Sequence, residues 1–293
     1  MPELPEVQTT VNGLKLKVLK RTFNDVWSNW NKIIKKPKGF KQFKKGIKNK
    51  KIIKVWRRAK NIIFELSDGH SLLIHQKMTG HLLVGKWQFL DGKWKPEKEG
   101  PLSDPYNRFL HLVFFFDNGE MMALSDVRKF AKVELWKTKE LLNSEEFNNL
   151  GPEPLDNDFT FIKFKEILKN KKGRIKQVLM NPEIIAGIGN IYASEILWQA
   201  KIHPEERVEK LKTPELKLLY KYIKKVLILG VKLGGESFSD YRKPDGTKGN
   251  FDIERKAYGR EGQKCSRCKT KIERIKVGQR SAFFCPYCQQ LKK

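Results

Sequence analysis

The chain opens with MPELPEV, which places a proline directly behind the first methionine and a glutamate behind each proline. A small second residue allows the methionine to be trimmed, and trimming would leave Pro2 with a free secondary amine. An α-amino group has a reference pKa of about 8, so a neutral, nucleophilic fraction exists near neutral pH. Alternatively, the two Pro-Glu pairs only start a helix, whose N-terminus favours acidic side chains.

A second reactive group lies near the other end of the chain, in the pairs CSRC and CPYC. Sixteen residues separate the pairs, a spacing typical of a four-cysteine zinc site. Four thiolates leave no open position for water, so one structural Zn²⁺ is expected. Two disulfides are the alternative, but a chain without a secretory signal is expected in a reducing compartment. The predicted ligands are Cys265, Cys268, Cys285 and Cys288.

The chain is strongly basic, with 60 Lys and Arg against 33 Asp and Glu, a net charge of +27. Such an excess indicates a polyanionic partner, either nucleic acid or an anionic membrane surface. No apolar run approaches the roughly 18 residues of a membrane span. We therefore expect nucleic acid as the partner, no membrane, and a cytoplasmic location. The lysine run over residues 35–54 is interpreted as an exposed, solvated surface.

The first half of the chain carries two hairpin signals. Residues 62–75 have apolar arms around Asp68-Gly69, and residues 110–125 have similar arms around Asn118-Gly119. Asp-Gly and Asn-Gly between β-rich arms favour tight hairpin turns. The first half is therefore expected to form an antiparallel β domain.

The second half is predicted to be helical, beyond a boundary near the proline-rich residues 148–158. Residues 213–230 predict an amphipathic helix that Gly230 or Gly234 closes. A further helix is expected from Asn181, interrupted at residues 187–190 and then resumed. Glycines before a resumed helix can present N–H groups to a phosphate, although many such breaks are only tight connections.

Two segments near the end are predicted to present residues to a ligand. Residues 234–250 predict a long mobile loop, either a functional lid or a plain connector. Residues 269–284 predict a basic hairpin that turns at Val277-Gly278, with Arg280 just past the turn.

Together these features resemble the bacterial formamidopyrimidine-DNA glycosylases, base-excision repair enzymes that remove oxidised purines. The matching stretches run in family order over residues 1–290: MPELPEV, RRAKNIIFEL, HQKMTG, DVRKF, LGPEPL, GIGNIYASEIL, YGREGQKC and GQRSAFFCPYCQ. The resemblance implies a two-domain α+β fold: an N-terminal antiparallel β-sandwich with a leading helix, and a C-terminal helix–two-turn–helix domain with a four-cysteine zinc finger. It implies a monomer that acts on double-stranded DNA containing oxidised purines or abasic sites.

The resemblance assigns catalytic roles to three residues and a supporting role to a fourth. The trimmed Pro2 would attack the deoxyribose and form a cationic iminium, which permits β,δ-elimination at the abasic site. Glu3 would be the proton donor, and Glu6 would be a supporting acid. Lys60 would contact phosphate and assist catalysis.

The resemblance also assigns DNA contacts. Asn190 and Arg280 would pinch the backbone around the lesion. Met78, Arg128 and Phe130 would fill the gap left by the flipped nucleotide, because extruding a base costs a few kcal/mol. Without the family, Met78 and Phe130 would be interpreted as ordinary packing at hairpin ends.

Other positions match the family less closely. Lys176 aligns with a lysine implicated in recognition of oxidised guanine. Residues 237–250 occupy the position of a lesion-capping loop, but their sequence matches poorly. Ala131 stands where the family commonly has glycine, which would crowd the preceding turn. Structural roles are expected for His75, His111 and His203.

The predicted division has five parts: an N-terminal catalytic domain (1–136), a linker (137–155), a helix–two-turn–helix domain (156–236), a capping-loop region (237–258) and a zinc-finger hairpin (259–293). Two alternatives stay open. One is an endonuclease VIII-type enzyme, which prefers oxidised pyrimidines. The other is a non-catalytic zinc-ribbon protein that binds damaged DNA or RNA.

Overall fold

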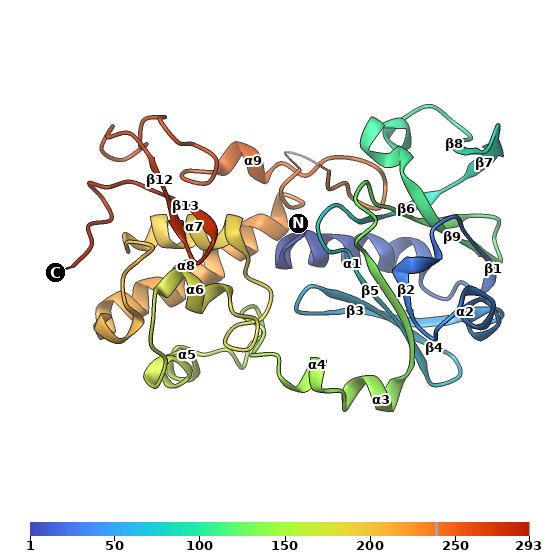
Figure 1. Ribbon diagram of the computed structural model, residues 1–293, viewed down its shortest axis with the longest axis horizontal. Coiled ribbons are helices and arrows are strands. Elements are labelled where there is room, and N and C mark those ends of the chain that lie inside the picture. The colour runs from blue at the N-terminus through green and yellow to red at the C-terminus, as the bar shows by residue number, and fades with distance from the viewer. Residues whose placement is uncertain (238–239, 293) are drawn as a thin grey trace. The chain divides into compact units, whose positions relative to one another are not determined.

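The computed structural model describes residues 1–237 and 240–292, and the chain divides into two compact units (Figure 1). Unit 1 comprises Met1–Asn148 and Leu233–Asp252, and unit 2 comprises Asn149–Lys232 and Ile253–Lys293. Residues 238–239 of the predicted capping loop lie outside the described residues. The five-part division is finer than the two units and stays a prediction.

Unit 1 contains two main sheets. One has the order β1-β9-β10-β6, with β1 (Phe23–Ser28), β9 (Leu110–Phe116), β10 (Met121–Ser125) and β6 (His81–Gly85). The other has the order β2-β11-β5-β4-β3, with β2 (Ile34–Lys36), β11 (Lys132–Lys137), β5 (His70–His75), β4 (Asn61–Leu66) and β3 (Ile52–Arg58). The pairs are antiparallel apart from the short parallel pair of β2 and β11. A separate hairpin is formed by β7 (Trp87–Leu90) and β8 (Lys93–Pro96).

Both predicted hairpins are confirmed. β4 pairs with β5 around Asp68-Gly69, and β9 pairs with β10 around Asn118-Gly119. The two glycines have φ values of 78° and 77°, a left-handed conformation that glycine adopts without a steric penalty. The local turn chemistry therefore determines where these strands reverse.

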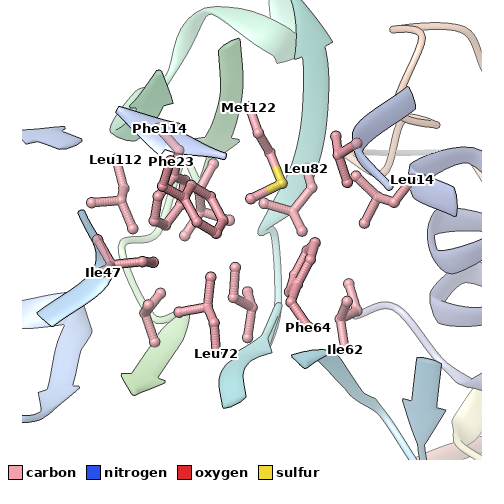
Figure 2. Close-up of a cluster of buried hydrophobic side chains, with 14 of the residues drawn as sticks. Leu14, Phe23, Ile47, Ile62, Phe64, Leu72, Leu82, Leu112, Phe114 and Met122 are labelled. Carbon is pink, nitrogen blue, oxygen red and sulfur yellow. The ribbon is translucent and has the colours of Figure 1, made fainter. Parts of the chain in front are cut away.

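The main core of unit 1 lies where the two sheets meet the helices α1 (Leu4–Val18) and α2 (Phe40–Ile47). In Figure 2, Phe64 and Leu72 come from one sheet and Leu82 and Phe114 from the other, and their side chains point toward one another. Burying a side chain of this size contributes about 1.5–3 kcal/mol. Close packing on both sides of the core holds the two sheets in one arrangement.

Secondary clusters cover the outer faces of both sheets. Ile63 and Leu73 pack with residues of α3 (Thr138–Leu142) and α4 (Glu145–Asn148). On the other sheet, Val113 and Ala123 pack with Trp87 of the β7–β8 hairpin. Because both faces are covered, these antiparallel strands have nearly continuous apolar runs rather than an alternating pattern. Short 3-10 helices complete the unit: η1 (Asn31–Ile33), η2 (Pro101–Ser103) and η3 (Pro105–Arg108).

Unit 2 is mainly helical. It contains α5 (Phe161–Lys169), α6 (Ile175–Met180), α7 (Asn190–Ala200), η4 (Val208–Lys210), α8 (Thr213–Lys232) and the hairpin of β12 (Glu273–Val277) and β13 (Arg280–Phe284). The short helix α9 (Phe251–Glu254) spans the third boundary between the units, at Asp252 and Ile253. None of the described helices is both long enough and apolar enough to cross a membrane.

The long predicted helix is confirmed as α8, and its apolar face is buried at Leu219, Ile223 and Val226. Gly230 lies inside the helix, so the closing glycine is Gly234, which has a φ of 77°.

The prediction that a helix begins at Asn181 is wrong. α6 ends at Met180, and the following residues form turns and bends until α7 begins at Asn190. The reason is a competing set of partners: Gly151 N donates to Pro182 O at 2.9 Å, and Ala186 N donates to Pro152 O at 3.0 Å. The backbone groups that would continue a helix are thus used to hold residues 151–152.

Candidate functional site

The N-terminal acid pair is buried at the start of α1. Pro2 is buried, and Glu3 and Glu6 are only 2% and 1% exposed. Glu3 is the N-cap residue, and its N–H donates to Glu6 Oε2 at 2.7 Å. The expected helix start is therefore present. Both carboxyl groups are therefore shielded from solvent within four residues of Pro2.

Glu6 also fixes the segment that follows α8. Its Oε1 accepts a hydrogen bond from Glu236 N at 2.7 Å, and its carbonyl oxygen accepts one from Tyr241 Oη at 3.0 Å. Burial raises the pKa of Tyr241, so the phenol remains a donor. Gly235 has a φ of 82°, and a Cβ there would lie 2.8 Å from Glu6 Oε1. These residues of the predicted loop are held against α1, and the mobility of the loop stays a prediction.

Lys60 lies at the tip of the β3–β4 hairpin. The strands pair up to Arg58 and Asn61, which leaves Ala59 and Lys60 as a two-residue turn. Ala59 has a φ of 51°, and its carbonyl oxygen accepts a hydrogen bond from Arg57 Nη1 at 2.9 Å. Lys60 therefore lies in a short turn that a side-chain hydrogen bond supports, and its contact with phosphate stays a prediction.

Burial and nearby cations, including Lys60, lower the pKa of His75. Burial, followed by the cations of Lys77 and Lys60, lowers the pKa of His75 to about 3. Its Nδ1 accepts a hydrogen bond from Lys77 N at 2.9 Å. The imidazole is thus neutral at physiological pH, which fits the structural role expected for it.

The structure brings together the two turns that carry the predicted gap-filling triad. Met78 lies in the turn between β5 and β6, and Arg128 and Phe130 lie in the loop between β10 and β11. Arg128 N donates to Thr79 Oγ1 at 3.1 Å, which joins the two turns. Phe130 is 52% exposed, and the Arg128 guanidinium lies 4.6 Å from the centre of its ring.

Ala131 is the last residue of this loop and is buried in the main core of unit 1. Its N–H donates to Asp126 Oδ2 at 2.8 Å. The methyl group of Ala131 is thus accommodated in the core.

Unit 2 carries the other predicted DNA contacts. Asn190 is the first residue of α7, and its Oδ1 is buried without a hydrogen-bond partner among the described residues. Arg280 is exposed at the start of β13. The hairpin turns at Gly278-Gln279, with φ values of 53° and 62°, one residue later than the predicted Val-Gly turn.

Lys176 lies inside unit 2, with 1% of its surface exposed. Its Nζ donates to Ser281 O at 2.6 Å and to Ser194 Oγ at 3.3 Å. Lys176 therefore ties β13, the strand that begins with Arg280, to α6 and α7. In this structure the ammonium group of Lys176 donates its hydrogen bonds to groups of the protein itself.

The four cysteines form a compact cluster with their ligand atoms within 4.8 Å of one another. All four thiols are free, and the Sγ–Sγ distance of 3.4 Å between Cys268 and Cys285 exceeds a disulfide bond, which is about 2 Å. Four sulfurs around one Zn²⁺ lie about 3.8 Å apart, because each Zn–S bond is about 2.3 Å. The donor set therefore fits one tetrahedral metal ion.

The electrostatics of this cluster fit a bound cation. A hydrogen bond from the Thr270 side chain lowers the pKa of Cys268 to about 6, whereas burial and the neighbouring thiols raise the pKa of Cys288 to about 12. The thiols cannot all ionise together unless a positive ion compensates their charge.

Sequence reasoning missed three buried polar residues: Thr79, Asp126 and Glu195. Burial raises the pKa of Glu195, and its carboxylate accepts backbone N–H groups from Lys256, Ala257 and Tyr258 at 2.7–2.9 Å. It thus anchors the segment that precedes the zinc-finger hairpin. Each of the three lies inside a motif that matches the family: HQKMTG, DVRKF or GIGNIYASEIL. A polar residue inside such a motif was the signal that could have identified them.

Comparisons with known proteins agree with this geometry. Residues 1–133 match the family model of the formamidopyrimidine-DNA glycosylase N-terminal domain, and residues 150–242 match that of the formamidopyrimidine-DNA glycosylase H2TH domain. Residues 262–291 match the zinc finger found in FPG and IleRS. The three matches together account for most of the chain.

The similarity extends over the full length of individual relatives. The formamidopyrimidine-DNA glycosylase of Ligilactobacillus salivarius is 37% identical over 292 residues, which is 100% of both chains. Lactococcus lactis Fpg, solved with DNA containing an abasic site, is 35% identical with a TM-score of 0.85, over 98% of this chain and 99% of that one. A variant of the same enzyme, solved with Fapy-dG DNA, has a TM-score of 0.86 at 35% identity, over 99% and 100% of the two chains. The chain therefore belongs to the formamidopyrimidine-DNA glycosylase family.

Proposed function

We propose that this protein removes oxidised purines, 8-oxoguanine and formamidopyrimidines, from double-stranded DNA and then cleaves the abasic site. The observation that carries the proposal is the burial of Glu3 and Glu6 directly behind Pro2. The Lactococcus lactis relatives, which were solved with abasic-site and Fapy-dG DNA, support the same substrate class.

The nucleophile proposed is the amine of Pro2 after Met1 has been removed. Its lone pair attacks C1′, the glycosidic bond breaks, and the base leaves with the bonding electrons and takes up a proton. Glu3 delivers a proton to O4′ as the sugar ring opens, which gives a C1′ iminium. Glu6, through its hydrogen bonds to Glu3 N and Glu236 N, positions the acid and the segment beside it.

Strand cleavage follows from the charge of the iminium. A secondary amine gives a permanently cationic iminium, which acidifies the C2′ hydrogen. Loss of that proton expels the 3′ phosphate, a second elimination expels the 5′ phosphate, and water then releases the sugar fragment from Pro2. Lys60, presented by its rigid turn, is proposed to hold a phosphate during these steps.

The proposed DNA contacts divide between the units. In unit 1, Met78, Arg128 and Phe130 fill the gap left by the flipped nucleotide. In unit 2, Asn190 and Arg280 hold the backbone, and Lys176 takes part in lesion recognition. To meet a base, the Lys176 ammonium would have to leave Ser281 O. The metal proposed at Cys265, Cys268, Cys285 and Cys288 is one structural Zn²⁺.

Borohydride trapping tests the proposed nucleophile. Protein without Met1 is incubated with duplex DNA carrying 8-oxoguanine opposite cytosine, and borohydride reduces the iminium to a stable covalent adduct. We expect a protein–DNA band that is lost when Met1 is retained and strongly reduced by Pro2→Gly.

Two outcomes would favour the alternatives. No band on this duplex or on an abasic duplex, with zinc and DNA binding confirmed, would favour a non-catalytic DNA-binding protein. Faster excision of thymine glycol than of 8-oxoguanine would favour an endonuclease VIII-type enzyme.

A further inference from the structure

We propose that Thr79 and Asp126 are positioning residues that lock two turns into one rigid wedge, defined here as residues 76–80 together with residues 126–131. The wedge carries Met78 on one turn and Arg128 and Phe130 on the other. The inference rests on the proposed function, because it concerns how the gap-filling triad is supported.

A single hydroxyl group joins the two turns. Thr79 is buried, and its Oγ1 donates a short hydrogen bond to Asp126 Oδ1 while it accepts one from Arg128 N at 3.1 Å. A hydroxyl can donate and accept at the same time, which a methyl group cannot. Replacing this oxygen by carbon would leave a buried carboxylate oxygen and a backbone N–H each without this partner.

The Asp126 carboxylate closes the loop at both ends. Asp126 is 0% exposed; Oδ1 also accepts from Arg128 N at 3.3 Å, and Oδ2 accepts from Ala131 N at 2.8 Å. Its own N–H donates to Phe109 O at 2.9 Å, which anchors the loop to the residue just before β9. A buried carboxylate must be satisfied by donors, and here these donors come from both turns of the wedge.

Each turn is also stiff in itself. Gly80 N donates to Gln76 O at 3.0 Å, and a Cβ on Gly80 would lie 2.5 Å from that oxygen. On the other turn, Lys129 has a φ of 57°, and its Nζ lies 4.5 Å from the centre of the Trp30 ring. Phe130, a large apolar side chain that folding leaves exposed, is thus displayed from a fixed base.

A rigid wedge suits insertion into a base stack. Side chains that already share one arrangement lose less conformational freedom on binding than side chains on two independently moving turns. The benefit applies only where the DNA offers a gap. On intact duplex, contacts to phosphate dominate affinity and do not depend on the wedge.

The test compares Thr79→Val, which keeps the shape but removes the hydroxyl, with Thr79→Ser, which keeps the hydroxyl. Affinity is measured for a duplex with a tetrahydrofuran abasic analogue and for the same duplex undamaged. We expect Thr79→Val to weaken binding to the abasic duplex about tenfold, because two uncoupled turns would have to be ordered on binding. Binding to the intact duplex should not change. Thr79→Ser should keep the wild-type ratio of the affinity for the abasic duplex to the affinity for the intact duplex.

A matched control removes a buried hydroxyl outside the wedge. Ser71 Oγ lies 2.9 Å from Thr138 Oγ1, and Ser71→Ala should keep the wild-type ratio of affinities. Asp126→Asn provides a second route, because it exchanges one acceptor oxygen for a donor. It should lower the same ratio.

Several results would overturn the inference. They are a wild-type ratio in folded Thr79→Val and Asp126→Asn, an equal loss of affinity for both duplexes, and a Thr79→Ser variant as weak as Thr79→Val. A wild-type protein with no preference for the abasic duplex would overturn the proposed function and this inference together.

Discussion

Glu6 lies beside the proposed proton donor Glu3 and also has a structural task. One carboxylate oxygen accepts from Glu3 N, and the other accepts from Glu236 N, so the group holds the start of α1 and the segment after α8 at once. The close approach of Gly235 is part of the same arrangement. A side chain at position 235 would therefore disturb the acid pair rather than only the loop.

We expect Gly235→Ala to lower the excision rate strongly and to reduce the free energy of unfolding by about 1–3 kcal/mol, since it combines a clash with a left-handed φ. Gly92→Ala is the matched control, because Gly92 has a similar φ of 74° but a Cβ there would have none of the described atoms within 4 Å. Single-turnover excision and urea unfolding measure the two effects. Equal excision rates for the two variants would contradict the role given to the contact with Glu6.

A single buried residue, His81, makes the free energy of unfolding depend on pH. Burial lowers the pKa of His81 to about 4, although its contacts with Asn107 Oδ1 and Thr79 O act in the opposite direction. In the unfolded chain the imidazole takes up a proton near pH 6.5. Between these values the unfolded state binds more protons, so the free energy of unfolding falls as the pH drops from 6.5 to about 4.

We expect this single group to account for about 3 kcal/mol of that loss. His81→Gln should therefore show a shallower decline than the wild type when unfolding is measured by urea titration from pH 7.5 to pH 4.5. Parallel declines for the two proteins would mean that other groups control the acid sensitivity.

At the scale of elements, the β12–β13 hairpin depends on its cysteine cluster. The hairpin has two short strands, and its small apolar cluster includes the four cysteines together with Trp198 and Ile272. The large core of unit 1 contains none of these residues. A hairpin with so little buried apolar surface is marginal in water without a staple.

Chelation of the metal should therefore unfold the hairpin while the core of unit 1 remains folded, and Cys285→Ala should have the same effect. Zinc analysis should give about one ion per chain, as a closed four-thiolate site requires. Amide exchange resolved by segment would measure the local loss, with Ser266→Ala as a control inside the finger. Unchanged protection of residues 273–284 after complete metal removal would contradict this dependence.

At the scale of the whole molecule, the net charge of +27 favours binding to DNA. Only the cations that contact phosphate contribute to the salt dependence of affinity, because each contact releases counterions. The net charge therefore does not predict how steeply the affinity for DNA falls with salt concentration, and individual residues must be tested.

We expect Arg280→Gln to reduce the slope of log K against log salt by about one, with similar weakening for every DNA sequence. Lys41→Gln removes the same charge from the lysine run that we interpret as solvated, and it should leave the slope unchanged. Fluorescence anisotropy at several salt concentrations measures both. A larger change for Lys41→Gln would assign the DNA contact to that run instead.

The sequence by itself determined the features whose signals are local. Asp-Gly and Asn-Gly specified the β4–β5 and β9–β10 hairpins because the turn conformation depends on the residues in the turn. The cysteine spacing specified the metal cluster for the same reason, since each pair already lies within one short loop. The helix expected from Asn181 did not form because its backbone groups bond to a distant segment: Pro182 O accepts from Gly151 N, and Ala186 N donates to Pro152 O.

Only the tertiary structure decided which buried polar groups meet. Thr79 and Asp126 are 47 residues apart, Lys176 and Ser281 are 105 apart, and Glu6 and Glu236 are 230 apart. No periodicity or turn signal connects such positions. Their pairing follows from strand order and from the need of each buried donor and acceptor to find a partner within reach once water is excluded.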